Sequence, residues 1–178
     1  DNARRYAFFA RAALAVLPRI CSTPLLLHAH DWHTALAPVY LRTLHAGDAW
    51  YDGVSTVLTV HNAGYQGQFH ADTMPDVGLP WSLFNMHQLE WHGWMNTLKG
   101  GLTFADAVTT VSPTHAFELR TPAGGFGLNG VFSALRDRFV GITNGIDQDR
   151  WDPETDSQIA YRFSRDDLRG KRRCRWAL

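Results

Sequence analysis

The chain alternates short apolar runs with segments whose apolar residues recur every three or four positions. The apolar runs at 25–28, 54–60, 107–111 and 139–143 predict strands of a buried sheet, and the run at 54–60 is rich in β-branched residues. The intervening pattern predicts helices over 3–17 (closed by Pro18), 32–46, 94–104, 113–119 and from the glycine-rich stretch 124–130 through Arg136, with a helical tail from Arg165. Residues 69–93 lack clean periodicity and are expected to form a long structured loop with short helical turns. The alternation predicts an α/β fold, a Rossmann-like parallel sheet flanked by helices.

Polar side chains follow three of the predicted strands directly. Asp31 comes after the first strand, His61 after the second and Asn144 after the fourth. Because open parallel sheets bind ligands at the carboxyl ends of their strands, we expect these three side chains to converge there. A carboxylate, an imidazole and a carboxamide can bind a hydroxyl-rich ligand through directed hydrogen bonds. The alternative for each is a structural role, capping a helix or satisfying a loop backbone.

A second interpretation of the first strand end is a metal site. His28, His30, Asp31 and His33 are closely spaced, and histidine and aspartate are common ligands of catalytic zinc. Their order differs from the familiar metallohydrolase pattern, and no downstream set of ligands completes the site. We therefore expect no metal.

Two further motifs have structural as well as functional explanations. Residues 125–130 read Gly-x-Gly-x-x-Gly, but a helix end and a turn precede them instead of a strand, which argues against dinucleotide binding and favours a flexible active-site loop. Four aromatic residues could stack on sugar rings, although packing in the core or a loop is the commoner role: Trp81, Phe84, Trp91 and Trp94.

Composition narrows the class of protein. The 178 residues carry a net charge of zero, which argues against nucleic acid or an anionic membrane as the partner. The apolar runs are far shorter than a membrane span. Cys21 and Cys174 are expected to be reduced thiols of a cytoplasmic protein. The first and last residues interrupt helical patterns, so we expect a fragment of a longer protein.

With these residues in place, the chain resembles the bacterial glycogen synthases and plant starch synthases. The matching stretches cover most of residues 1–169 in the family's order. They are the segments 28–38, 59–67, 98–102, 105–106, 110–114, 125–131, 143–147 and 151–153. The resemblance implies one incomplete half of a glycosyltransferase fold with two Rossmann-like domains. Residues 1–164 would be the later part of the N-terminal, acceptor-side domain, and residues 165–178 a helical tail leading toward a C-terminal nucleotide-binding domain that lies outside this chain.

The resemblance also implies a reaction. A hexosyltransferase of this family transfers glucose from ADP-glucose to the non-reducing end of an α-1,4-glucan such as glycogen or starch, with retention of configuration and without a metal or other cofactor. His61 corresponds to a catalytic histidine that hydrogen-bonds the donor glucose. Asp31 and Asn144 match positions at the donor-sugar site, and Tyr65 and Gln66 lie in the loop beside it. UDP-glucose as donor and a non-catalytic glucan-binding remnant are the alternatives. We expect this chain alone to be inactive, and a plastid location if the source is a plant.

Overall fold

The computed structural model describes all residues from Asp1 to Leu178. They form two compact units, Asp1–Thr143 and Asn144–Leu178. The elements of the first unit are, in order, α1 (Asn2–Ile20), β1 (Leu25–His30), α2 (Asp31–Thr34), α3 (Leu36–Thr43), β2 (Val54–Val60), β3 (Gln68–His70), α4 (Thr73–Asp76), β4 (Glu90–Trp91), β5 (Trp94–Asn96), α5 (Thr97–Phe104), β6 (Ala107–Thr110), α6 (Pro113–Leu119), α7 (Asn129–Ala134) and β7 (Phe139–Gly141). Short 3-10 turns span Tyr51–Gly53, Trp81–Leu83 and Arg136–Arg138.

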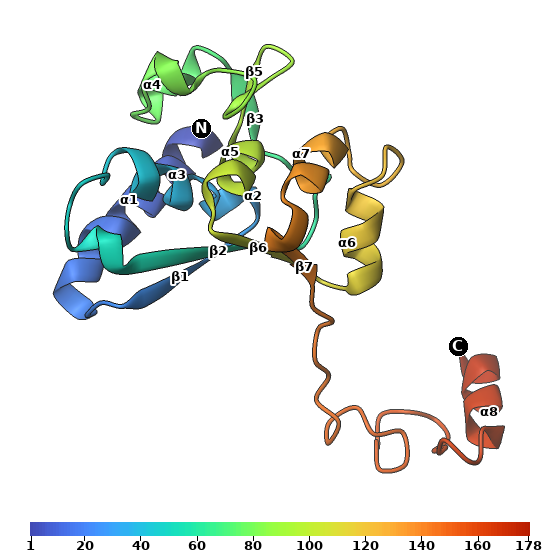
Figure 1. Cartoon of the computed structure of the whole chain (residues 1–178). Coiled ribbons are helices and arrows are strands. Elements are labelled where there is room, and N and C mark those ends of the chain that lie inside the picture. The colour runs from blue at the N-terminus through green and yellow to red at the C-terminus, as the bar shows by residue number, and fades with distance from the viewer. The chain divides into compact units, whose positions relative to one another are not determined.

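A four-stranded parallel sheet in the order β1-β2-β6-β7 is the centre of the first unit. Figure 1 shows α1, α3 and α5 on one side of this sheet. Strand residues on that side are buried, among them Ala29, Leu58 and Val108, because alternate side chains of a strand point to opposite faces. The predicted α/β class and parallel sheet are confirmed.

The prediction of a single helix over 32–46 is wrong. The structure has α2 and α3 there, with Ala35 between them at φ −62° and ψ −19°. The prediction that Pro18 closes the first helix is also wrong, since α1 continues to Ile20 with Pro18 inside it. Proline lacks an N–H, so Leu14, four residues earlier, loses its intrahelical donor. The Tyr51 hydroxyl donates to the Leu14 carbonyl oxygen instead, at 3.0 Å.

Residues 69–93 contain more regular structure than the sequence predicted. β3, β5 and β4 form an antiparallel sheet in that order, and their pairing places Phe69 opposite Met95 and Glu90 opposite the same residue. Strands of two or three residues carry too few side chains for a period-2 pattern to appear. Met95 is fully buried and joins this sheet to the core that α1 and α3 share.

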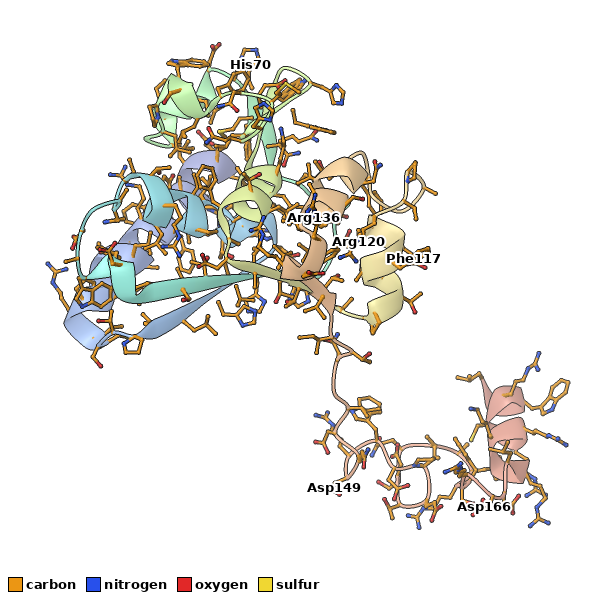
Figure 2. The ribbon with its side chains drawn as sticks, in the orientation of Figure 1. His70, Phe117, Arg120, Arg136, Asp149 and Asp166 are labelled. Atoms are coloured by element: carbon orange, nitrogen blue, oxygen red, sulfur yellow. The ribbon has the colours of Figure 1, made fainter.

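The last elements of the first unit are joined by hydrogen bonds of the half-buried Arg120. Its guanidinium donates to the carbonyl oxygens of Arg136 and Phe139, both at 3.0 Å, and lies over the Phe139 ring. Figure 2 labels Arg120 and Arg136. Ser112 caps α6 by accepting from the His115 amide at 3.0 Å, and Pro113 follows as the first residue of the helix, where its missing N–H costs nothing.

The second unit, Asn144–Leu178, consists of turns followed by α8 (Arg169–Ala177). α8 has no buried residue, and Asp167 pairs with Arg169 at its start, at 2.6 Å. No helix in the structure has the length and hydrophobicity needed to cross a membrane.

Candidate functional site

The turn after β1 holds the loop after β2. Asp31 has a left-handed backbone, at φ 54°, which is uncommon for residues other than glycine and is best tolerated by asparagine and aspartate. Its Oδ1 accepts hydrogen bonds from the backbone amides of His61, at 2.7 Å, and Asn62, at 3.3 Å. The ends of β1 and β2 therefore meet as the parallel topology predicts, and Asp31 makes its contact through the loop backbone.

Three imidazoles form a row along this edge of the sheet. His30 Nδ1 lies 3.0 Å from His61 Nε2, and the His28 ring stacks on the His30 ring with centroids 4.2 Å apart. His28 Nε2 lies 2.6 Å from Thr59 Oγ1, which is itself 2.6 Å from Thr109 Oγ1. Burial lowers the pKa of His30, the neighbouring His28 and His61 lower it further, and Asp31 opposes them. His30 is thus held toward its neutral form.

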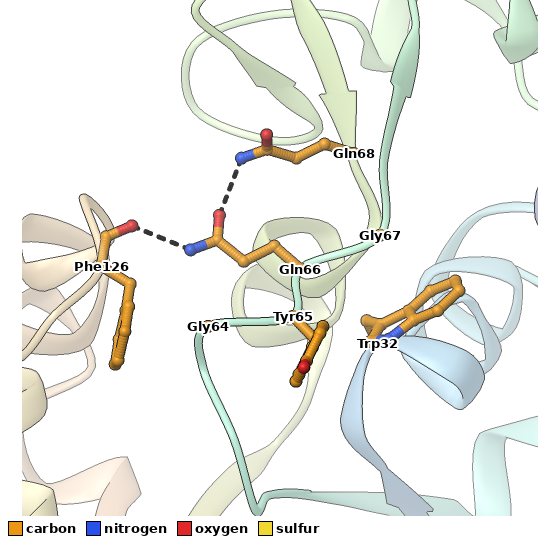
Figure 3. A pocket seen from close by; sticks show the side chains of 7 residues that line it. All are labelled: Trp32, Gly64, Tyr65, Gln66, Gly67, Gln68 and Phe126. Atoms are coloured by element: carbon orange, nitrogen blue, oxygen red, sulfur yellow. Dashed lines mark hydrogen bonds between the residues drawn. The ribbon is translucent and has the colours of Figure 1, made fainter.

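Gln66 ties the loop after β2 to its neighbours. Its Nε2 donates to the carbonyl oxygens of Ala63, at 3.1 Å, and Phe126, at 2.8 Å. Its Oε1 accepts from Asn96 Nδ2 at 2.7 Å and from Gln68 Nε2 at 3.0 Å. Figure 3 shows the bonds of Gln66 to Gln68 and Phe126. A glutamine amide has two donor hydrogens and two acceptor lone pairs, so all of its capacity is used within the protein.

A cavity of about 420 Å³ opens beside this loop. Figure 3 shows its seven lining residues: Trp32, Gly64, Tyr65, Gln66, Gly67, Gln68 and Phe126. Tyr65 and Phe126 are 69% and 54% exposed, so their rings are available to a ligand at the rim. Aromatic faces with a few polar groups suit a sugar ring, which has apolar C–H surfaces and hydroxyl edges.

Glycine is required in the loop at position 67. Gly67 has φ 62°, and a Cβ there would collide with Thr97 Oγ1 and the Trp32 ring. The backbone of Gly67 accepts from the Thr97 amide at 3.1 Å, and the Gln66 carbonyl accepts from the Leu98 amide at 3.0 Å. The loop is therefore fixed against the start of α5 by its own backbone.

Lys99 is buried against the segment 86–90 and does not line the cavity. It is only 2% exposed, and its Nζ donates to the carbonyl oxygens of Met86, at 2.6 Å, and Glu90, at 2.5 Å. Burial lowers its pKa, and Glu90 opposes this. Lys99 therefore has a structural role in this unit.

Four of the five predicted site residues lie in the first unit, at the ends of β1 and β2 and in the loop after β2: Asp31, His61, Tyr65 and Gln66. Asn144 is the first residue of the second unit and is exposed, so its role stays a prediction. No group of three or more His, Cys, Asp or Glu side chains is arranged to hold a metal ion.

Sequence reasoning missed the parts of the site that come from distant loops. Phe126 and Gln68 line the cavity, and neither follows a strand. The glycine motif gave a signal for residues around Phe126 but did not indicate its neighbour Gln66. The four aromatic residues that the sequence indicated as possible sugar-stacking groups do not line the cavity: Trp81, Phe84, Trp91 and Trp94. Phe84 and Trp91 pack against the hydrophobic core instead.

Comparisons with known proteins agree on one family. Residues 1–134 match the model of the starch synthase catalytic domain. Curated glycogen synthases from Anaeromyxobacter sp. (strain Fw109-5) and Koribacter versatilis are 48% and 47% identical over 178 and 171 residues, which is 100% and 96% of this chain but 38% and 35% of theirs. The catalytic domain of starch synthase IV from Arabidopsis thaliana, solved with ADP and acarbose bound, matches 99% of this chain and 36% of its own with a TM-score of 0.80 and 36% identity.

The chain therefore spans a little more than a third of the length of these relatives. The family match covers most of the first unit, including Asp31, His61 and the cavity lining. The parallel sheet agrees with the matched glycosyltransferase structure. This chain belongs to the starch synthase catalytic domain family.

Proposed function

We propose that this chain supplies part of the acceptor-side domain of a glucan synthase. The whole enzyme would transfer glucose from ADP-glucose to the non-reducing end of an α-1,4-glucan with retention of configuration. The names of the relatives support glucan synthesis, and the ADP and acarbose bound to the Arabidopsis starch synthase support a nucleotide-sugar donor and a glucan acceptor. Residues 1–164 would belong to this domain and residues 165–178 to the tail that precedes a nucleotide-binding domain. The unpaired Cys21 and Cys174 suit a bacterial cytoplasm.

The observation that carries the proposal is the double anchoring of His61. Its backbone amide is held by Asp31 and its ring by His30, at the carboxyl edge of the sheet and in the loop that leads to the aromatic cavity. When a glycosidic bond to a phosphate breaks, positive charge develops on the sugar ring. Preorganised hydrogen-bonding groups stabilise such charge because they need no reorganisation during the reaction. We assign this role to His61.

The other residues contribute in different ways. Asp31 places His61, and Tyr65 offers an exposed ring beside the donor sugar. Gln66 has no unused hydrogen-bonding group, so its proposed role at the donor-sugar loop is to hold Phe126 and Tyr65 in place. Asn144 is proposed as a donor-sugar residue from its family position alone.

The test is a chimera in which these 178 residues replace the matching segment of the Anaeromyxobacter glycogen synthase, which aligns with the whole chain. We expect incorporation of labelled glucose into glycogen from ADP-glucose, with a lower rate from UDP-glucose, and none from the 178 residues alone. A chimera that unfolds cooperatively on heating but transfers glucose from neither donor would contradict the proposal.

The Trp32–Tyr65–Phe126 cavity favours one alternative, a non-catalytic glucan-binding module, because it lies wholly within the first unit. In that case the 178 residues would co-sediment with glycogen, and Tyr65→Ala would abolish co-sedimentation while the folded chimera stayed inactive.

A further inference from the structure

We propose that His30 is a positioning residue that fixes the ring of His61 and leaves only Nδ1 of His61 free to bind a ligand. The importance of this positioning for glucose transfer rests on the proposed function, whereas the contact between His30 and His61 is independent of it. His30 Nδ1 and His61 Nε2 are 3.0 Å apart, and their rings are inclined by 24° with centroids 5.3 Å apart.

The fold places the two rings together. His30 is the last residue of β1 and pairs with Thr59 of β2, and His61 follows the end of β2 directly. The Thr34 hydroxyl anchors the His30 backbone on both sides, accepting from its amide at 2.5 Å and donating to its carbonyl oxygen at 2.8 Å. Both partners of the imidazole pair are thus fixed at the backbone, since Asp31 holds His61.

A second imidazole supports His30 from the other side. His28 lies two residues earlier on β1, and its ring is inclined by 30° to that of His30 at a centroid distance of 4.2 Å. Thr59 and Thr109 connect His28 to β2 and β6 through contacts of 2.6 Å. The orientation of His30 is therefore set by three strands of the sheet, and it does not depend on a ligand.

The chemistry of the pair restricts its proton positions. A neutral imidazole has one N–H donor and one acceptor nitrogen, so a hydrogen bond between two rings needs one hydrogen in total on the two facing nitrogens. The ionisable groups that face His30 are His28, His61 and Asp31. Burial and the two neighbouring imidazoles lower the pKa of His30, with Asp31 opposing them, which favours the neutral form of His30. In that form one of the two facing nitrogens carries the hydrogen and the other accepts it.

The experiment measures ring nitrogen shifts by NMR in the ¹⁵N-labelled 178-residue chain. The compared variants are His30→Ala, His30→Asn, whose amide group reaches the position of Nδ1, and His87→Ala, an exposed control without a side-chain hydrogen bond. We expect the two ring nitrogens of His61 to show the separated shifts of a single tautomer in the wild type and in His87→Ala. His30→Ala should give averaged shifts, and His30→Asn should restore the separation. Backbone amide shifts of Asn62 report whether the fold is retained.

Unchanged His61 shifts in a folded His30→Ala chain would overturn the proposal. In the chimera, His30→Ala should lower kcat by roughly 10- to 100-fold with a smaller change in KM, because a misplaced reactive group costs rate more than binding. An active chimera with unchanged kcat in His30→Ala would refute the positioning role and leave the proposed function intact. A folded but inactive chimera would refute the proposed function. The positioning contact would still stand if the His61 ring shifts depend on His30 in the NMR experiment.

Discussion

Asp31 and His61 are joined by a hydrogen bond of 2.7 Å from the His61 amide to the Asp31 carboxylate. The bond connects the first residue after β1 to the first residue after β2, so the carboxyl ends of two parallel strands form one structure. Asp31 reaches this position with φ 54°. The strain of that backbone is offset by charge-assisted bonds to two amides, those of His61 and Asn62.

Asp31→Ala should release the His61 loop, while Asp31→Asn should largely keep it. Alanine loses both hydrogen bonds and is less tolerant of a left-handed backbone, whereas asparagine retains an acceptor oxygen and tolerates that conformation. Amide hydrogen exchange at His61 and Asn62 should accelerate by roughly tenfold or more in Asp31→Ala, which corresponds to about 1.4 kcal/mol. Equal exchange in both variants would show that the carboxylate does not hold the loop.

Gln66→Leu should destabilise the first unit. The substitution removes the donor to the Phe126 carbonyl oxygen and the acceptor of the Asn96 amide. Asn96 is fully buried, and a buried group left unpaired costs about 1–3 kcal/mol. Urea unfolding measures the loss. Gln68→Leu is the matched control: Gln68 is exposed and makes one of the four bonds, so a smaller effect is expected. A Gln66→Leu chain as stable as Gln68→Leu would contradict the bracing role of Gln66.

Tyr51→Phe should cost about 1–2 kcal/mol because it leaves the Leu14 carbonyl oxygen without a donor inside the protein. A double-mutant cycle with Pro18→Ala tests the reason. Alanine at position 18 restores the N–H that bonds Leu14 within the helix, so the cost of Tyr51→Phe should fall in that background. The same cost in both backgrounds would show that Tyr51 does not compensate for the proline.

Asp106 should make the fold sensitive to acid. Burial acts to raise its pKa, but hydrogen bonds from the Thr56 amide, at 2.7 Å, the Thr56 hydroxyl, at 2.9 Å, and Arg42, at 2.6 Å, outweigh it and lower the pKa. A carboxyl with a lowered folded-state pKa contributes its stability above the ordinary value of about 3.8. That contribution is lost as the pH falls through the folded-state pKa.

Asp106→Asn should therefore be less stable than the wild type at pH 6, and the difference should shrink as the pH falls below about 3.8. Urea midpoints measured at several pH values provide the check. Asp52→Asn, at an exposed position without a side-chain hydrogen bond, is the control and should track the wild type. A difference between Asp106→Asn and wild type that does not vary with pH would contradict this explanation.

The fold class and the meeting of two strand ends could be predicted from the sequence, because the buried parallel strands are short apolar runs and polar residues follow them directly. The apolar runs predicted that Asp31 and His61 follow two neighbouring parallel strands, and the structure places them at the ends of β1 and β2. The contact between Gln66 and Phe126 could not be predicted, since it joins two loops that are 60 residues apart. The role of Asp31 at a backbone amide also depends on its φ angle, which residue type alone does not determine.

The most direct test of the central claim is the rate of glucose transfer from ADP-glucose by the chimera carrying His61→Ala, compared with the chimera carrying His87→Ala. If His61 stabilises the charge that develops on the donor sugar, its loss should lower kcat by roughly 100-fold or more, and thermal unfolding should stay the same. His87→Ala should transfer at the rate of the unsubstituted chimera. Equal rates in the two variants would contradict the assignment of His61 to the chemistry.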